Sequence, residues 1–309
     1  MTLWIIIGLL AVAAALVKAF DRKVPGTLYK VVLLVWAIGP LVGTVWAIVL
    51  LWQHWISWLD LTLFVVFYFL TGMGITAGFH RLLTHSSFET PAPVRATLLI
   101  LGSMAGQGKP IDWAANHLKH HAFSDKEGDP HSPVEGLWHA HMGWFFTGDP
   151  ADRERYGKKW ESDRVVQFVD RTAEIWLVLG LLIPFLIGGW SGFLWGGLVR
   201  FAFLNHATFA VNSICHAFGA RPFDTKDESR NNWLIAFLTF GEGWHNNHHA
   251  FPAMAYHGMS WRQFDPTAVV IKLLVWLKLA KNVKLPRPEL VDRRLTKPAA
   301  APAPVQPGD

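Results

Sequence analysis

Histidines gathered in three short clusters are the residues of this chain best suited to chemistry. The first cluster has two histidines five residues apart, and the other two clusters each hold three histidines within five residues. The clustered positions are His80 and His85; His117, His120 and His121; and His245, His248 and His249. On a helix, residues three and four apart share a face, so each triad can direct its imidazoles to one side. Neutral imidazole is the commonest metal ligand in proteins, so we interpret the clusters as one metal centre.

The number of clustered histidines indicates more than one metal ion. Two ions with about four nitrogens each are the simplest division of eight imidazoles. Cys215 is the only cysteine, so no cysteine cluster competes for the metal and no intrachain disulfide can form. Imidazole suits iron and zinc alike, so the ligands alone do not select the metal.

The hydrophobic residues are concentrated in long blocks and make up 51% of the chain. This pattern predicts a single all-α integral membrane protein. Five blocks approach the ~20 apolar residues needed to cross a bilayer. They are residues 3–20, 31–52, 59–79, 173–189 and 191–211. Shorter apolar runs at 94–106 and 267–280 are expected in the membrane interface or in a cap.

The basic residues around the early blocks predict the orientation. Residues 53–59 contain no lysine or arginine, whereas the first connection and its flanks contain four: Lys18, Arg22, Lys23 and Lys30. By the positive-inside rule, that first connection is cytoplasmic and the N-terminus is outside. The third block then ends at His80 on the cytoplasmic side, and the last two blocks form a hairpin that returns there before His216. All the histidine clusters are therefore predicted on one side of the membrane.

Composition also gives predictions for the two ends of the chain. The block at 3–20 has no basic region before it and no clear cleavage site after it, so we expect a retained helix and not a signal peptide. The proline- and alanine-rich segment 286–309 is predicted to be a disordered tail after one domain of residues 1–285. The net charge of +5 suits anionic lipid headgroups or a phosphorylated substrate carrier. The basic residues are scattered and accompany no nucleic-acid motif, so no nucleic-acid partner is expected.

With these residues in view, the chain resembles the membrane fatty-acid desaturases of the acyl-CoA delta-9 (stearoyl-CoA) type, in their compact bacterial form. The resemblance extends from about residue 30 to residue 285. Its most specific parts are His80 to His85, His117 to His121, Asn212-Ser-Ile-Cys-His216 and Gly241-Glu-Gly-Trp-His245-Asn-Asn-His-His249. Supporting stretches are Phe123-Ser-Asp-Lys-Glu-Gly-Asp-Pro-His131, His141-Met-Gly-Trp144 and Asn282-Val-Lys-Leu-Pro286.

The resemblance implies a di-iron site and a mushroom shape. The implied iron ligands are His80, His85, His117, His120, His121, His216, His245, His248 and His249. Asn212 is implied to hold a metal-bound water. The stem would have four core spans, preceded here by the extra span at 3–20, under a cytoplasmic cap of residues 80–172 and 212–285.

The implied activity is the oxygen-dependent introduction of a cis double bond, at delta-9, into a saturated chain carried as acyl-CoA or on a lipid. Removing hydrogen from an unactivated methylene needs a strong oxidant, which iron and dioxygen supply and zinc does not. A buried apolar tunnel would hold the substrate, since each buried methylene contributes ~0.8 kcal/mol. The chain has no haem, Rossmann or ferredoxin motif. Electrons would therefore come from a separate partner of ferredoxin, cytochrome b5 or flavoprotein reductase type.

Two features depart from the pattern of this family. The charged residues that help the animal enzymes hold coenzyme A are replaced here by Ala115-Asn116 and Thr147-Gly-Asp149, which leaves the acyl carrier open. Four basic residues close in sequence are alternative phosphate contacts: Arg153, Arg155, Lys158 and Lys159. The second departure is the extra N-terminal span, for which we derive no role.

Other polar residues near the clusters have less specific interpretations. Four single histidines are interpreted as structural: His54, His139, His206 and His257. Five further residues either orient a ligand or have a structural, capping or solvated role: His131, His141, Asp129, Glu242 and Asn246. Arg200 falls inside the last apolar block and is expected to face protein, a cavity or the membrane edge.

Two alternative functions are compatible with the clusters. A related histidine-box enzyme, such as a hydroxylase, a ketolase or a desaturase of intact lipids or sphingolipids, would use the same kind of centre, and product analysis separates these activities. A membrane metal transporter without catalysis is an alternative from a different class. Transport needs ligands near the bilayer midplane, whereas these clusters lie beyond the predicted span ends.

Overall fold

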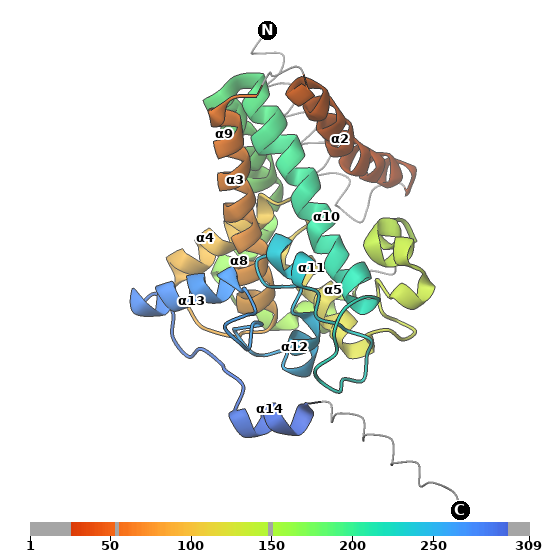
Figure 1. The fold of residues 1–309 in the computed structure, drawn as a ribbon. Helices are drawn as coiled ribbons and strands as arrows, with labels where there is room; N and C mark the ends of the chain where they lie inside the picture. The colour runs from red at the N-terminus through yellow and green to blue at the C-terminus, as the bar shows by residue number, and fades with distance from the viewer. Residues whose placement is uncertain (1–25, 53–55, 148–150, 296–309) are drawn as a thin grey trace, which may run out of the picture.

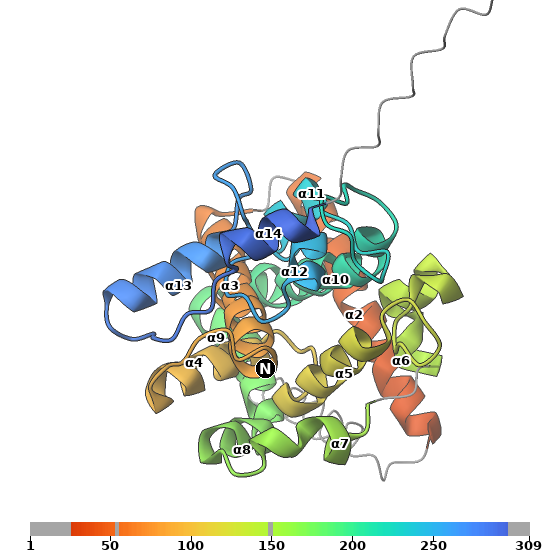
Figure 2. The same ribbon diagram turned by 90° about the horizontal axis from the view of Figure 1, so that it is seen from below.

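The protein, described by a computed structural model over residues 26–52, 56–147 and 151–295, is built from helices. Within these ranges β pairing is limited to isolated bridges, as predicted for an all-α chain. The long helices are α2 (Gly26–Trp52), α3 (Trp58–Met73), α9 (Ala173–Gly192) and α10 (Arg200–Ser213). The others, of 4 to 14 residues, are α4 (Ala92–Ser103), α5 (Pro110–Phe123), α6 (Trp144–Thr147), α7 (Arg153–Gly157), α8 (Arg164–Arg171), α11 (Trp233–Leu238), α12 (His245–Ala250), α13 (Pro266–Trp276) and α14 (Pro288–Arg294). Figure 1 shows the first four helices standing together above a layer formed by the others, and Figure 2 shows that second layer from below.

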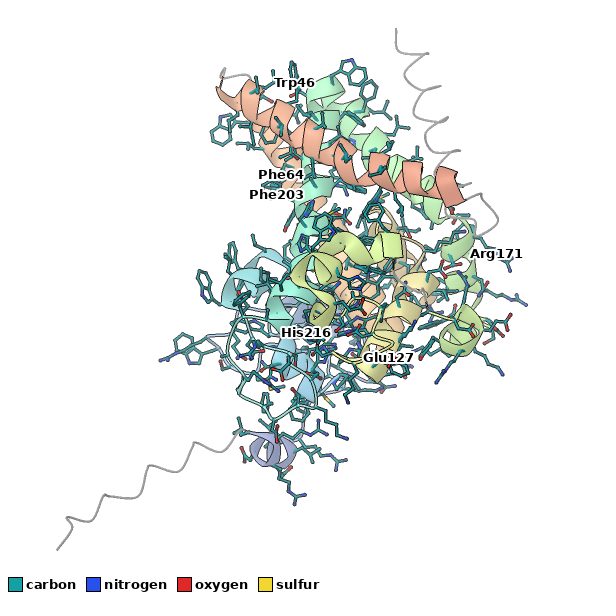
Figure 3. All side chains as sticks on the ribbon, turned by 90° about the vertical axis from the view of Figure 1, so that its right-hand side faces the viewer. Trp46, Phe64, Glu127, Arg171, Phe203 and His216 are labelled. Carbon is teal, nitrogen blue, oxygen red and sulfur yellow. The ribbon has the colours of Figure 1, made fainter. Side chains whose placement is uncertain are left out.

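Three stretches of helix are long and apolar enough to cross a membrane: Leu33–Leu51, Trp58–Thr84 and Ala173–His216. On α2, the apolar side chains of Val42, Val45 and Trp46 are more than half exposed. Contact with lipid explains such an exposed apolar face. Figure 3 shows Trp46 and other apolar side chains on these long helices, away from the polar layer that holds His216. The chain is therefore a membrane protein, and the block predicted at 3–20 lies outside the described residues.

The third stretch, 44 residues long, folds back on itself. Gly189 adopts φ 60° and ψ −145°, a conformation that favours glycine. A Cβ on Gly192 would clash with the carbonyl oxygen of Pro184. Residues eight apart in a straight helix are ~12 Å apart, so the chain must reverse between them. The reversal falls between the predicted blocks 173–189 and 191–211, and α9 and α10 run in opposite directions in Figure 1.

A wide helix, η1 (Gly74–Thr84), continues α3 into the polar layer. It is wound as a π-helix, and after its last residue the His85 N–H donates to the His80 carbonyl, 3.1 Å away. A side chain on Gly74 would clash with the backbone of Gly102, so α4 packs directly against η1. Buried side chains, including Phe79, join these helices to α5, α8 and α10 in one core. This packing fixes the helix that carries the first histidine cluster.

Arg200, the charged residue inside the last apolar block, faces protein. Its side chain is fully buried. Its guanidinium donates to three backbone carbonyls, those of Gly196 at 3.1 Å, Met104 at 3.0 Å and Gly180 at 2.9 Å. These hydrogen bonds satisfy the group away from lipid and tie α10 to α9 and to the end of α4.

Helix α14 lies within the segment that composition predicts to be a disordered tail. The Arg294 guanidinium donates to the Ala250 carbonyl and lies 5.1 Å from the centre of the Phe251 ring. The Asp224 N–H donates to the Arg294 carbonyl at 3.0 Å. Residues 288–295 therefore pack on the end of α12, because arginine contacts anchor a stretch whose composition alone gives no core. The rest of the predicted tail, 296–309, lies outside the described residues.

Candidate metal centre

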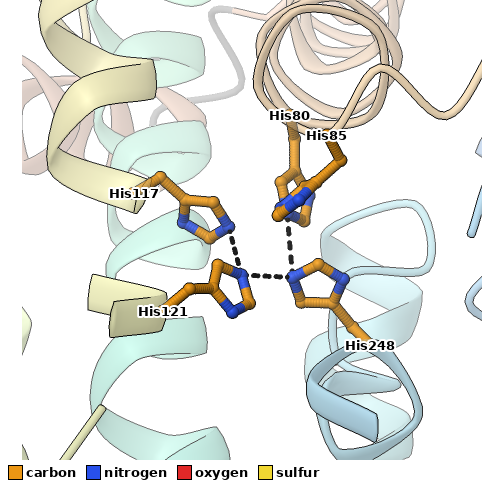
Figure 4. Close-up of side chains that lie close together, drawn as sticks. All are labelled: His80, His85, His117, His121 and His248. Atoms are coloured by element: carbon orange, nitrogen blue, oxygen red, sulfur yellow. Dashed lines mark hydrogen bonds between the residues drawn. The ribbon is translucent and has the colours of Figure 1, made fainter. Parts of the chain in front are cut away.

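The predicted ligands lie together in two adjacent groups of histidines. We call them the five-histidine group and the four-histidine group. The first contains His80, His85, His117, His121 and His248, and the second contains His120, His216, His245 and His249. Within each group the candidate ligand atoms all lie within 4.8 Å of one another. Figure 4 shows the five-histidine group, with imidazoles arriving from η1, α5 and α12.

The two histidine triads are each divided between the groups. Helix α5 places His117 and His121, which are one turn apart, in the five-histidine group and His120 in the four-histidine group. Helix α12 divides its triad in the opposite way, with His248 alone in the five-histidine group. The middle histidine of each triad is rotated ~100° or more from at least one of the other two, which allows this division. The structure thus divides the histidines of each triad between two groups, a division that the sequence left open.

The spacing of His80 and His85 suits the π-helix that carries them. In an α-helix, residues five apart are rotated by ~140° and point in different directions. The wider turn of η1 closes hydrogen bonds between residues five apart and brings such residues onto one face. The two imidazole centres are consequently 4.8 Å apart.

Hydrogen bonds at the helix starts hold the ligand helices in place. The Asp170 carboxylate accepts from the Ile111 N–H at 2.9 Å, at the beginning of α5. The Asn231 side-chain oxygen accepts from the N–H groups of Asn246 at 2.9 Å and Asn247 at 3.2 Å, in the first turn of α12. These contacts satisfy backbone donors that a helix start leaves free. Asn246 itself bonds the backbone of Phe223 and contacts no ligand nitrogen, which favours its structural role.

The Nε2 atoms converge within each group. In the five-histidine group, His121 Nε2 lies 3.0 Å from His117 Nε2 and 2.9 Å from His248 Nε2. His80 Nε2 lies 3.1 Å from His248 Nε2 (Figure 4). In the four-histidine group, the corresponding distances are 2.9 Å between His216 and His245 and 3.4 Å between His120 and His249. Neighbouring nitrogens bound ~2.1 Å from one ion lie ~3.0–3.4 Å apart, so both groups have the spacing of ligand sets.

Three carboxylates fix the tautomers of the four-histidine group. The Nδ1–H groups of His120, His216 and His249 donate to three carboxylates: Asp129 at 3.0 Å, Asp125 at 2.9 Å and Asp227 at 2.9 Å. With Nδ1 protonated, each Nε2 carries a lone pair directed at the other histidines. Converging lone pairs repel one another unless a cation lies among them. The residues present therefore fit a bound metal ion.

The five-histidine group has a different carboxylate arrangement. Glu242 contacts His80 Nδ1 and also pairs with the buried Arg81 guanidinium at 3.0 Å. Arg81 in turn pairs with Asp265, again at 3.0 Å. Glu242 and Asp129 thus both contact predicted ligands, which favours an orienting role for these two carboxylates.

The environment keeps the imidazoles neutral, as metal binding requires. Burial, with a smaller contribution from neighbouring histidines, lowers the pKa of His85, His117 and His121 well below the usual value. Burial is also the main cause that lowers the pKa of His120 to about 3, against the opposing effect of Asp125 and Asp227. Neutral nitrogens are therefore available at physiological pH.

Two histidines outside the predicted ligand set pack against the groups. His257, interpreted from the sequence as structural, is buried with its ring 4.6 Å from that of His248. Its Nδ1 lies 3.5 Å from Glu242 Oε2. His131 packs in a similar way against the four-histidine group, with its ring 4.4 Å from that of His120. Its Nδ1 lies 3.8 Å from Asp129 Oδ1.

The remaining single histidines lie apart from both groups. His141 Nδ1 is 3.0 Å from Ser213 Oγ, and its Nε2 is 3.0 Å from His206 Nδ1. His139 Nε2 lies 3.6 Å from Glu135. His54 lies outside the described residues. These positions agree with structural roles.

Sequence reasoning missed Asp125 and Asp227 as partners of the ligands. Asp125 lies in the stretch 123–131, which carries part of the family resemblance, so a signal for it existed. Asp227 stands in a loop without a motif, and only the tertiary structure brings it to His249.

A cavity borders both groups. Its polar lining includes His80, His117, His245 and Asn212. Its apolar lining includes Ile75, Leu204, Val211 and Phe240. A neighbouring cavity shares Trp113, His117, Thr208 and Asn212 with it and reaches Trp144, Phe145 and Phe209. Asn212 therefore faces space beside ligands of both groups.

The basic residues proposed as phosphate contacts are partly engaged elsewhere. Arg153 pairs with Asp112 at 2.9 Å and with Asp170. Lys159 donates to the Thr84 carbonyl at 2.7 Å. Asn116 accepts the Ala151 N–H at 2.8 Å, next to the first histidine of α5.

The fold and the site define a class: a helical membrane protein with two adjacent histidine groups of metal-binding type beside an apolar cavity. Comparison with known sequences gives the family. The family described as fatty acid desaturase matches residues 56–268, and the chain belongs to this family, as its motifs predicted.

Similar proteins carry related activities in their names. The "sn-1 stearoyl-lipid 9-desaturase" of Anabaena variabilis is 45% identical over 233 residues, which cover 74% of this chain and 85% of the relative. The "Hex-5-enoyl-[acyl-carrier protein] acetylenase" of Moorena producens is 38% identical over 282 residues, which cover 84% of this chain and 88% of the relative. The "Icosanoyl-CoA 5-desaturase" of Limnanthes douglasii is 41% identical over 238 residues, which cover 75% of this chain and 65% of the relative. The chain is accordingly a fatty-acyl desaturase, an oxidoreductase.

Proposed function

We propose that this chain introduces a cis double bond at position 9 of a saturated acyl chain, with two iron ions and dioxygen. The observation that carries the proposal is the pair of neutral histidine groups beside one apolar cavity. Iron, when bound by the nine predicted histidines, supplies with dioxygen the oxidising power to remove two vicinal hydrogens. The position-9 activity named for the Anabaena relative supports the regiochemistry.

The chain's own residues position the reactants. Asp125, Asp129, Asp227 and Glu242 hold the imidazoles in the tautomer that directs Nε2 inward. The apolar walls of the cavity exclude water and hold the acyl chain by burial, at ~0.8 kcal/mol for each methylene. Asn212, at the junction of the two cavities, offers an amide to a water beside the metal centre.

We propose an acyl chain bound to a glycerolipid as the substrate. The positions that resemble coenzyme A contacts in animal enzymes hold Ala115 and Asn116. Ala115 is buried, and the Asn116 side chain accepts a hydrogen bond from the Ala151 backbone N–H. Arg153 is already paired with two carboxylates and is a poor candidate for binding a phosphate. A lipid substrate also needs no soluble carrier to reach helices that lie in the bilayer.

The protein is proposed to act in the cell membrane as one domain of residues 1–285, with five spans and a cytoplasmic cap that holds the irons. The predicted orientation rests on the basic first connection. A cytoplasmic centre is accessible to a separate electron donor of ferredoxin, cytochrome b5 or flavoprotein reductase type. That donor would supply two electrons for each double bond formed.

The test is the fatty-acid profile of cells that express the chain, resolved by lipid class and with double-bond positions determined by mass spectrometry. A control carries His120→Ala and His121→Ala, one ligand from each group. New position-9 unsaturation on glycerolipids, absent from the control, is the expected result. Unsaturation that appears first in the acyl-CoA pool would refute the lipid substrate, and hydroxylated chains in place of unsaturated ones would favour the related hydroxylase.

A further inference from the structure

The carboxylates beside the four-histidine group have no cationic partner within the described part of the chain other than histidine. Asp125 accepts the Glu228 N–H at 2.7 Å, and Asp129 accepts the Asp125 N–H at 2.9 Å. Asp227 accepts the Ser229 N–H at 3.0 Å. The ion pairs of the three carboxylates in this part of the chain are all with histidines. Three negative charges therefore surround this group, and the Arg221 guanidinium pairs with Glu228 and donates to the Asp227 backbone carbonyl, not to its carboxylate.

The five-histidine group has the opposite surroundings. Its one carboxylate in contact with a ligand, Glu242, shares the Arg81 guanidinium with Asp265. Lys159 donates to the carbonyl of Thr84, the residue before His85. Two cations, Arg81 and Lys159, and two carboxylates, Glu242 and Asp265, thus lie around this group.

We infer that the two groups bind their metal ions unequally, so that the four-histidine group takes up the first ion and retains it while the five-histidine group releases its ion first. Carboxylates that accept a proton from a ligand imidazole increase its basicity, and their charge attracts a divalent cation. Nearby ammonium and guanidinium groups oppose that cation. A fifth neutral imidazole adds a ligand but no charge.

The expected size follows from the carboxylate count. Removing an outer partner of a metal-bound histidine typically lowers affinity 10- to 100-fold. The four-histidine group has three such partners and the five-histidine group has one. The two additional partners predict a metal affinity about 100- to 10,000-fold higher for the four-histidine group. The assignment rests on the proposed function only in taking both groups as metal sites.

The inference is tested by metal binding without catalysis. The purified full-length chain, stripped of metal, is titrated with Co²⁺ and separately with Zn²⁺, then challenged with increasing chelator, and metal per chain is measured by mass spectrometry. The expected result is two separate steps, with one equivalent retained at chelator concentrations that remove the other. Loss of both equivalents in a single step would overturn the inference.

Charge variants assign the steps. Asp227→Asn should weaken the tight step 10- to 100-fold and leave the weak step unchanged. Lys159→Gln, at an exposed position beside the Thr84 carbonyl, should strengthen the weak step severalfold and leave the tight step unchanged. Lys158→Gln, the exposed neighbouring cation, is the matched control and should change neither step.

The opposite assignment is also measurable. If Asp227→Asn weakens only the weak step, or Lys159→Gln affects only the tight step, the five-histidine group holds the tight ion and the inference is wrong. Because Lys159 is at an exposed position, its variant tests the inference even if the aspartate variant fails to fold. A chain that binds two ions in the expected order but makes no double bond would refute the proposed function and leave this inference intact.

Discussion

The five-histidine and four-histidine groups lie side by side and draw on the same two helices, α5 and α12, yet they are supported differently. In the four-histidine group, three of the four ligands are oriented by aspartates that come from loops. In the five-histidine group, one glutamate serves His80 and is itself held by a buried arginine. If both groups hold metal as proposed, the comparison teaches that equal ligand chemistry need not make equal metal sites, because the charges one shell further out affect how firmly each ion is held.

The largest effect should come from removing one ligand from either group. His248→Ala in the five-histidine group and His245→Ala in the four-histidine group should each reduce new unsaturation below detection, because the proposed reaction needs both ions. The measurement is the fatty-acid profile of expressing cells. His206→Ala, outside both groups, should retain most of the product. Activity that survives in either ligand variant would show that one group alone suffices.

Acid should destabilise the metal-free protein strongly. Buried histidines with a lowered pKa bind protons more readily when unfolded, so their contribution to stability is complete above pH ~6.5 and is lost as the pH falls toward 3. Each such histidine can cost up to ~2 kcal/mol at pH 5. The unfolding temperature in detergent should therefore fall between pH 7.5 and pH 5, and bound metal should oppose the fall.

The same experiment sharpens the comparison of the groups. Burial is the main cause that lowers the pKa of both His85 and His120, to about 3 for His120. Both imidazoles therefore stay neutral in the folded protein down to pH 5, and His85→Ala and His120→Ala should flatten the pH dependence equally. Unequal flattening would mean that one of the two binds a proton in the folded protein above pH 5.

A smaller but clear difference is expected in stability. Arg81→Met leaves Glu242 and Asp265 buried without their cation and should lower the free energy of unfolding by about 3–5 kcal/mol. Asp129→Asn in the four-histidine group removes a charge but keeps a hydrogen-bond acceptor. It should therefore lower the free energy of unfolding by only about 1–2 kcal/mol. Unfolding in denaturant measures both. Equal losses would show that Arg81 does not stabilise the five-histidine group in this way.

The smallest effects should follow changes at the two flanking histidines. His257 and His131 lie 3.5 Å and 3.8 Å from their carboxylates, which is too far for strong hydrogen bonds. His257→Gln and His131→Gln should each lower product formation about fivefold, which corresponds to a loss of about 1 kcal/mol in transition-state stabilisation. The metal content should be unchanged. Loss of a metal equivalent in either variant would make that histidine a ligand.

The sequence alone predicted the features that depend on residues close together in the chain, such as the histidine clusters and the apolar helices. Clusters at 117–121 and 245–249 indicated metal ligands without any structure, because three imidazoles at helical spacing have few other uses. Apolar block lengths predicted the helices, including the reversal near Gly189. Features that depend on the relative rotation of two helices, such as the division of each triad between groups, need the tertiary structure.

Long-range partners were also beyond the sequence. Asp125 and His216 are 91 residues apart in the chain, and no local pattern links them. The use of a π-helix to align His80 with His85 follows from hydrogen bonds that propensities do not specify. Helix α14 escaped prediction because long-range contacts of Arg294 and Val291 anchor it against a composition typical of disorder.

The division of both triads has a consequence for the synthesis of the protein. Each group needs nitrogens from α5 and from α12, and the pair His120 and His249 is separated by 129 residues. At ribosomal speeds of ~5–20 residues per second, the later ligand is made ~6–26 s after the earlier one. Neither ligand set is complete while the last apolar hairpin is still entering the bilayer. If the groups hold iron as proposed, its delivery is a late event in biogenesis, and a cell short of iron would accumulate inserted but empty protein.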